Sequence, residues 1–207
     1  MKLIKRTLGE LQTNCYILQE GHEAIIFDPA GEPEKIISYI EKQSLKPLAI
    51  LLTHSHFDHI GALEEIRQQY KAPVYVHPEE KEWLQNPELN GSLLFFGQKV
   101  TCRPAEYVVE ERSYTIGPFQ FDVFHTPGHS PPGGVAFIFH QESILIGGDS
   151  LFREGIGRTD LPGGDIDELI HSIEKKLFLL PEEYLVYPGH GPETSIGYEK
   201  QNNPFLQ

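Results

Sequence analysis

The sequence predicts an α/β fold in which two β-sheets pack face to face, with helices on the outside. Two observations predict it. Short apolar segments with strand character fill both halves of the chain, and each half also contains an amphipathic helix. This order of strands followed by helix occurs twice, which favours two packed sheets. At 207 residues the chain is expected to form a single domain, 1–207.

The first half is predicted to contain strands followed by helices. The expected strands are Lys2–Leu8, Thr13–Gln19, Glu23–Phe27 and the apolar run Leu48–Leu52. Isoleucines at helical spacing predict a helix over Glu34–Gln43, and a second helix is expected to end near Tyr70. Between the apolar strand and the second helix lies the polar loop Thr53–Gly61. Such a loop at the carboxyl end of a buried strand is where α/β sheets place their sites.

The remaining chain is also rich in predicted strands. These are Val74–His77, Tyr107–Glu111, Ser113–Ile116, Phe119–His125, Gly134–Phe139, Ser143–Ile146 and Tyr184–Tyr187. A short helix is expected at Pro78–Gln85 and a closing helix at Thr194–Lys200. An amphipathic helix is expected at Asp165–Leu179, with Ile166 and Leu169 among its inward residues. Asn86–Arg103 has no clear pattern and is predicted to be an irregular surface loop, either a flap over a site or a plain connector.

Composition excludes several functional classes. The chain has 17 basic and 30 acidic residues, a formal net charge of −13, and no lysine- or arginine-rich run, so we expect neither nucleic-acid nor membrane partners. Cys15 and Cys102 form no Cys-x-x-Cys motif and are expected to be buried thiols. No signal-peptide pattern or long apolar span is seen, which predicts a cytoplasmic protein. Its oligomeric state cannot be deduced.

Residues suited to binding metal gather in the loop after the fourth strand. Four potential ligands lie within six residues: His54, His56, Asp58 and His59. Imidazole and carboxylate ligands suit zinc, iron or manganese. The alternative, a histidine-rich polar loop without metal, becomes harder to accept in view of three further turns. Each follows a predicted strand and ends in a ligand-type residue, and these residues are His129, Asp149 and His190.

Glycine precedes each of these three residues, which lets the backbone approach an ion closely. The other histidines lack this context and are expected to be structural or surface residues. They are His22, His77, His125, His140 and His171.

At these residues the chain resembles the metallo-beta-lactamase superfamily, and within it the short glyoxalase II-like (hydroxyacylglutathione hydrolase-like) enzymes. The resemblance rests on the His-x-His-x-Asp-His loop, the three later ligands, Asp28-Pro29 and the two glycine-containing runs 147–152 and 157–164. It implies a four-layer αβ/βα sandwich. It also implies a first metal site formed by His54, His56 and His129, and a second formed by Asp58, His59 and His190, with Asp149 bridging both.

The resemblance implies a hydrolase with two divalent ions, zinc first and iron or manganese as alternatives. A hydroxide bridging two cations would attack a carbonyl carbon, and the ions would stabilise the oxyanion that develops. A thioester of a small thiol, such as S-lactoylglutathione or an analogous adduct, suits this chemistry because a thiolate leaves without a strong acid. Asp58 is expected to orient the nucleophile as well as bind metal.

Departures from the family pattern concern the substrate. Full-length glyoxalase II enzymes carry a C-terminal helical extension that helps to hold glutathione, and here the chain ends soon after His190. The stretch Ser130–Gly133 is one residue longer than the common pattern. The predicted substrate contacts are Arg158, Phe152 and Tyr198. The alternative for Arg158 is an ion pair with Asp160, and for the two aromatic residues it is core packing.

Two other reactions compete with thioester hydrolysis of a small-molecule substrate. Persulfide dioxygenases have a similar loop and use one iron, through residues that match His54, His129 and Asp149. The presence of the second-site residues favours hydrolysis over this alternative. A nuclease of the same fold is disfavoured by the net charge of −13.

Overall fold

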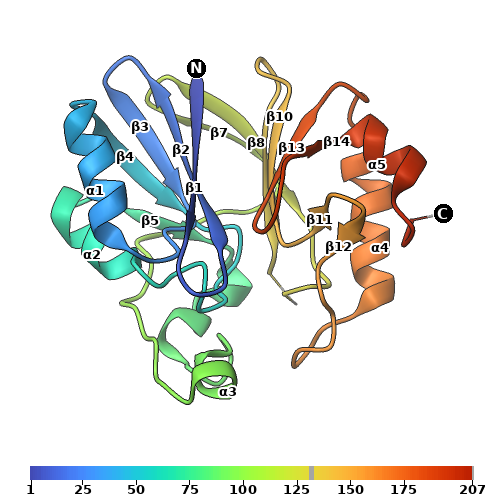
Figure 1. Cartoon of the computed structure of the whole chain (residues 1–207), viewed down its shortest axis with the longest axis horizontal. Coiled ribbons are helices and arrows are strands. Elements are labelled where there is room, and N and C mark those ends of the chain that lie inside the picture. The colour runs from blue at the N-terminus through green and yellow to red at the C-terminus, as the bar shows by residue number, and fades with distance from the viewer. Residues whose placement is uncertain (131–132, 207) are drawn as a thin grey trace. The chain divides into compact units, whose positions relative to one another are not determined.

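A computed structural model describes residues 1–130 and 133–206 of the chain (Figure 1). The chain divides into two compact units, which are described separately. Unit 1 comprises residues 1–109 and 115–119, and unit 2 comprises residues 110–114 and 120–207. Two residues of the Ser130–Gly133 stretch, Pro131 and Pro132, lie outside the described residues.

Unit 1 contains a six-stranded sheet in which the strands follow sequence order. These are β1 (Lys2–Leu8), β2 (Thr13–Glu20), β3 (Glu23–Phe27), β4 (Lys46–Leu51), β5 (Val74–Val76) and β6 (Tyr107–Val108). The first three strands pair antiparallel, and β3 to β6 pair parallel. The carboxyl ends of β3 and β4 therefore lie side by side, and the loops that follow these strands start at the same edge of the sheet.

Two helices pack on one face of this sheet, as the isoleucine spacing predicted. They are α1 (Pro33–Lys42) and α2 (Leu63–Tyr70), which Figure 1 shows side by side. Ile36, Ile40 and Ile66 are fully buried in the same cluster as Ile26 and Ile50 of the sheet. Burial of each such side chain contributes about 1.5–3 kcal/mol. This packing anchors the loop between β4 and α2 at both of its ends.

The segment after β5 is more ordered than expected. The helix predicted at Pro78–Gln85 is instead two short 3₁₀ helices, η1 (Pro78–Glu80) and η2 (Trp83–Gln85). The predicted irregular loop contains a short helix, α3 (Ser92–Phe96).

The buried side chain of Asn90 explains this local order. Its amide nitrogen donates to the carbonyl oxygens of Trp83 and Val100, and its amide oxygen accepts from the backbone N–H of Ser92. Hydrogen bonds of this kind leave no apolar periodicity in the sequence, so the pattern did not predict them.

Unit 2 carries most of a second six-stranded sheet, with strand order β14-β13-β10-β9-β8-β7. Its strands are β7 (Ser113–Ile116), β8 (Phe119–His125), β9 (Val135–Phe139), β10 (Ile144–Gly148), β13 (Leu185–Pro188) and β14 (Thr194–Ser195). The small hairpin of β11 (Leu151–Phe152) and β12 (Gly155–Ile156) was not predicted. Strand β10 pairs parallel to β13, which places their carboxyl ends side by side.

The helices of unit 2 are α4 (Ile166–Lys175), η3 (Leu177–Leu179) and α5 (Ile196–Asn202). Leu169, Ile173 and Leu177 are buried as predicted, but the inward placement of Ile166 is wrong, because its side chain is 48% exposed. Apolar spacing identifies a face of a helix but not where along the helix that face becomes covered. Among the described helices of both units, none is long and apolar enough to cross a membrane.

We expect both cysteine thiols to be unreactive in the native protein. Burial is the main cause that raises the pKa of Cys15 far above its usual range, and it raises the pKa of Cys102 to about 12. Little thiolate is then present at neutral pH, and the thiolate is the reactive form. A coloured disulfide reagent should therefore titrate two thiols in guanidinium chloride and none rapidly in buffer. Fast reaction of one thiol in buffer would contradict this burial.

Candidate metal centre

The loop after β4 gathers four potential metal ligands in unit 1. The ring centroid of His54 lies 4.8 Å from that of His56 and 4.0 Å from that of His59. The Nε2 atom of His59 lies 3.6 Å from Oδ2 of Asp58. The three imidazoles are between 0% and 6% exposed, so water competes little for them. These four side chains therefore lie close together within this unit.

Asp28, at the end of β3, holds two of these imidazoles in place. Its Oδ2 lies 3.0 Å from Nδ1 of His59 and accepts a hydrogen bond of 2.7 Å from the hydroxyl of Thr53. Its Oδ1 accepts from the backbone N–H of Thr53 at 2.8 Å, and the same hydroxyl lies 3.0 Å from Nδ1 of His54. With both Nδ1 atoms occupied in this way, Nε2 is the nitrogen of each ring that suits a metal.

In the sequence, Asp28 was noted only as part of the pattern that carries the family resemblance, so its supporting role was missed. Two signals were available: its position at the end of β3, next to β4 in a parallel sheet, and its Asp-Pro sequence. Asp28 also has a φ of 47°, which is uncommon for a residue other than glycine. Such strain persists where surrounding contacts impose it, as the Thr53 and His59 contacts do here.

Two further side chains support the loop from other segments. The hydroxyl of Thr13, at the start of β2, donates to Oδ2 of Asp58 at 2.7 Å. The fully buried carboxylate of Glu80, in η1, accepts from the backbone N–H of Ser55. The loop is therefore held by hydrogen bonds from β2, β3 and η1, which limits the reorganisation needed when a ligand binds.

Unit 2 brings together the other three predicted ligands. The Oδ2 atom of Asp149 lies 3.5 Å from Nε2 of His129 and 3.4 Å from Nε2 of His190. Asp149 follows β10 and His190 follows β13, and the parallel pairing of these strands brings the two residues together. The Nδ1 atom of His129 lies 2.7 Å from the carbonyl oxygen of Arg158, which again leaves Nε2 for a metal.

The donor atoms present fit divalent transition metals. Unit 1 offers three imidazoles and one carboxylate, and unit 2 offers two imidazoles and one carboxylate, all buried or half-buried. Nitrogen and carboxylate oxygen donors of this kind suit zinc, iron or manganese, whereas calcium and magnesium prefer oxygen alone.

The predicted substrate residues have partners within unit 2. The guanidinium of Arg158 pairs with both carboxylate oxygens of Asp160, at 2.7 and 2.9 Å, and this hydrogen-bonded pair holds the pKa of Asp160 at about 2. The hydroxyl of Tyr198 donates to Glu154. Phe152 presents its ring edge-on to His190, with centroids 6.1 Å apart. Contact of these three residues with substrate stays a prediction.

Two of the remaining histidines have structural partners, in line with expectation. His77 caps η1 by accepting from the backbone N–H of Glu79. His140 contacts Asp122 at 2.9 Å and Tyr184 at 2.8 Å.

Gly157 permits a close approach behind two of the candidate ligands. A Cβ atom at this position would lie 1.9 Å from the carbonyl oxygen of Asp149 and 3.0 Å from Cβ of His129. We expect Gly157→Ala to lower the free energy of unfolding by about 1–3 kcal/mol and to weaken metal binding, because both residues must shift. Gly155→Ala is the matched control, since its Cβ would meet only ordinary contacts with Phe152 and Arg153. Equal melting temperatures for the two variants would contradict the expectation.

Comparison with known proteins identifies the family. The metallo-beta-lactamase superfamily pattern matches residues 8–190. The chain belongs to this superfamily. It is 49% identical to the probable metallo-hydrolase YqgX of Bacillus subtilis, over all of this chain and 98% of that protein. It is also 36% identical to the hydroxyacylglutathione hydrolase GloC of Haemophilus influenzae, over 94% of this chain and 93% of that protein.

Solved structures of the superfamily confirm the predicted fold class, mixed α/β with two multi-stranded sheets and helices. The structure titled BLEG-1 B3 metallo-beta-lactamase matches with a TM-score of 0.96 and 49% identity, over 99% of both chains. The structure titled TTHA1623 in a di-iron-bound form matches with a TM-score of 0.88 and 40% identity, over 98% of this chain and 100% of that one. These relationships make the protein a metal-dependent hydrolase of the metallo-beta-lactamase superfamily.

Proposed function

We propose that this hydrolase cleaves a thioester formed between a small acyl group and a low-molecular-weight thiol. The observation that carries the proposal is the similarity to hydroxyacylglutathione hydrolase GloC, which extends over 93% of that protein. A relative with this name that aligns over 94% of this chain supports thioester hydrolysis as the reaction.

Seven residues would hold two divalent ions, and the chemistry of the donor atoms favours zinc. They are His54, His56, His129, Asp58, His59, His190 and Asp149, with Asp149 shared between the ions. Two cations close together lower the pKa of a bound water and stabilise a developing oxyanion. The di-iron form of TTHA1623 supports a site for two ions and makes iron the main alternative to zinc.

The residues around these ligands would supply orientation. Asp28 and Thr53 hold the rings of His54 and His59 through their Nδ1 atoms, and the Arg158 carbonyl does the same for His129. Thr13 holds Asp58 by a hydrogen bond of 2.7 Å, so that this carboxylate keeps one orientation toward the nucleophile. A thioester needs no strong general acid, because a thiolate is a good leaving group.

A second candidate function is hydrolysis of a β-lactam ring. The observation that favours it is the match to the structure titled BLEG-1 B3 metallo-beta-lactamase, at 49% identity over 99% of both chains. The two reactions need the same attack on a carbonyl carbon, but in the β-lactam the leaving group is an amide nitrogen, which must gain a proton.

The deciding experiment measures three activities of the metal-loaded protein. We expect loss of thioester absorbance with S-D-lactoylglutathione, and we expect this activity to disappear after chelation and to return with added metal. Turnover of a chromogenic cephalosporin without thioester hydrolysis would replace the proposal with the β-lactam reaction. Oxygen uptake with glutathione persulfide, again without thioester hydrolysis, would replace it with persulfide oxidation by an iron site.

A further inference from the structure

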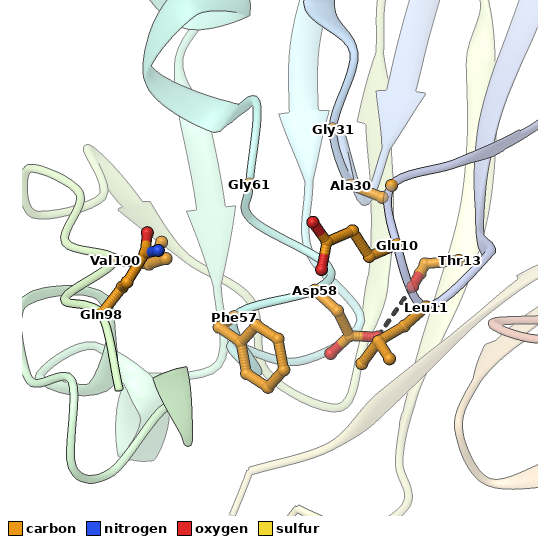
Figure 2. A pocket seen from close by; sticks show the side chains of 11 residues that line it. Glu10, Leu11, Thr13, Ala30, Gly31, Phe57, Asp58, Gly61, Gln98 and Val100 are labelled. Carbon is orange, nitrogen blue, oxygen red and sulfur yellow. Dashed lines mark hydrogen bonds between the residues drawn. The ribbon is translucent and has the colours of Figure 1, made fainter. Parts of the chain in front are cut away.

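A pocket of about 340 Å³ in unit 1 lies beside Asp58 (Figure 2). Its walls come from separate segments of this unit: the turn between β1 and β2, the loop after β3, the ligand-bearing loop after β4, and the segment after α3. The residues that line it are Gly9, Glu10, Leu11, Thr13, Ala30, Gly31, Phe57, Asp58, Gly61, Gln98 and Val100. The segment 86–103, which the sequence left as either a flap over a site or a plain connector, therefore contributes a wall of this pocket through Gln98 and Val100.

Close contacts on two sides give the walls of the pocket a defined arrangement. Phe57 is 4% exposed, its ring packs against that of Phe95 in α3 with centroids 5.6 Å apart, and its backbone N–H donates to the carbonyl of Asn90. On the opposite side, a Cβ atom at Gly61 would lie only 2.2 Å from the carbonyl oxygen of Ala30. The loops after β3 and β4 approach each other this closely because residue 61 has no side chain.

The charged side chains that line the pocket are both acidic. Its lining contains two carboxylates, Glu10 and Asp58, and none of the eleven described lining residues is lysine, arginine or histidine. The Asp58 carboxylate is engaged by Thr13 at 2.7 Å and has the proposed role of a metal ligand. Figure 2 shows the carboxylate of Glu10 extending into the space between Gly61 and Asp58. The thiol-carrier end of a substrate bound in this pocket would therefore lie near the negative charge of Glu10.

We propose that this pocket binds a positively charged ammonium group of the thiol carrier, and that Glu10 determines this specificity. The proposal rests on the thioester hydrolysis proposed above, for which it specifies the substrate class. A carboxylate attracts an ammonium group, and the nearby ring of Phe57 offers an aromatic surface that also favours a cation. A carboxylate of the carrier placed next to Glu10 would be repelled by it, although one that reached the ions proposed at Asp58 would be attracted, so the ammonium group is expected at the Glu10 side of the pocket.

The test compares two D-lactoyl thioesters of the same shape. One is the thioester of thiocholine, which carries a permanent quaternary ammonium, and the other is the thioester of 3,3-dimethylbutane-1-thiol, its neutral isostere. The ratio of kcat/KM for the cationic over the neutral thioester contains the better leaving ability of thiocholine as well as any ion pair, so each variant is compared with the wild type. We expect Glu10→Gln to lower this ratio about threefold to fivefold, as an exposed ion pair allows, and Glu10→Lys to lower it further.

Glu41→Gln is the matched control, because Glu41 is an exposed glutamate of α1 outside the pocket lining, and it should keep the wild-type ratio. High salt should reduce the ratio in the wild type by screening the charge of Glu10. Cleavage of both thioesters with a ratio that does not change in Glu10→Gln would overturn the assignment of Glu10 while leaving thioester hydrolysis in place.

A binding measurement keeps the proposal testable if neither thioester is cleaved, which would count against the proposed function. Thiocholine S-methyl ether and its neutral isostere are titrated into isotope-labelled protein, and amide NMR shifts are followed. We expect the cationic ether to shift the amides of Glu10, Leu11 and Val100, and this response to be lost in Glu10→Gln. Equal responses to the two ethers, or none at these amides, would overturn the proposal independently of catalysis.

Discussion

Replacing Asp149 with asparagine is expected to remove most of the activity and most of the bound metal. The carboxylate of Asp149 lies 3.5 Å from Nε2 of His129 and 3.4 Å from Nε2 of His190, and its proposed role is to bridge two ions. An amide is a neutral and weaker ligand, so both ions lose a negatively charged donor. Metal affinity should fall by more than the roughly 10–100-fold expected when a residue that only hydrogen-bonds to a metal ligand is replaced.

The measurement combines metal content after dialysis with kcat on the thioester substrate. Asp167→Asn is the matched control, because Asp167 is an exposed aspartate in the first turn of α4, in the same unit. It should retain metal and activity. If folded Asp149→Asn protein retained two ions per chain and hydrolysed the thioester at the wild-type rate, the proposal that the Asp149 carboxylate is shared between two ions would be refuted.

The second large effect is expected at Asp28, a residue that would contact no metal itself. Asp28→Ala removes the acceptor for the backbone N–H and hydroxyl of Thr53 and the partner of His59 Nδ1. Because Asp28 is 1% exposed, the groups it leaves behind find little water. We expect the free energy of unfolding to fall by about 1–3 kcal/mol for each unsatisfied group and the metal affinity to fall about 10–100-fold.

Asp28→Asn separates the structural part of this effect from the part that acts on the metal. Its amide oxygen can still accept from the backbone N–H of Thr53, so the melting temperature should fall less than in Asp28→Ala. Its amide nitrogen replaces Oδ2 and cannot accept a hydrogen bond from Nδ1 of His59, so metal affinity should still fall. Metal titrations of both variants test this. Wild-type affinity in Asp28→Asn would show that Asp28 stabilises the fold alone.

The elements predicted well are those with a strong local signal. The strand at Glu23–Phe27 agrees at both ends, and Ile36 and Ile40 of α1 are buried as their spacing predicted. Errors occur where order comes from side-chain hydrogen bonds or where an element is very short. The hydrogen bonds of Asn90 organise α3, and β11 and β12 are only two residues long, too short for an apolar pattern to form.

The sequence alone determined the superfamily, the fold class and the seven candidate ligands, because ligand-type side chains at strand ends form a pattern that does not depend on packing. The tertiary structure decided which groups surround them. Asp28 faces His59 across neighbouring parallel strands, the backbone rather than the guanidinium of Arg158 contacts His129, and Glu10 enters a pocket beside Asp58. These pairs of residues are 29 to 48 positions apart in the sequence, and such pairings arise only when the chain folds.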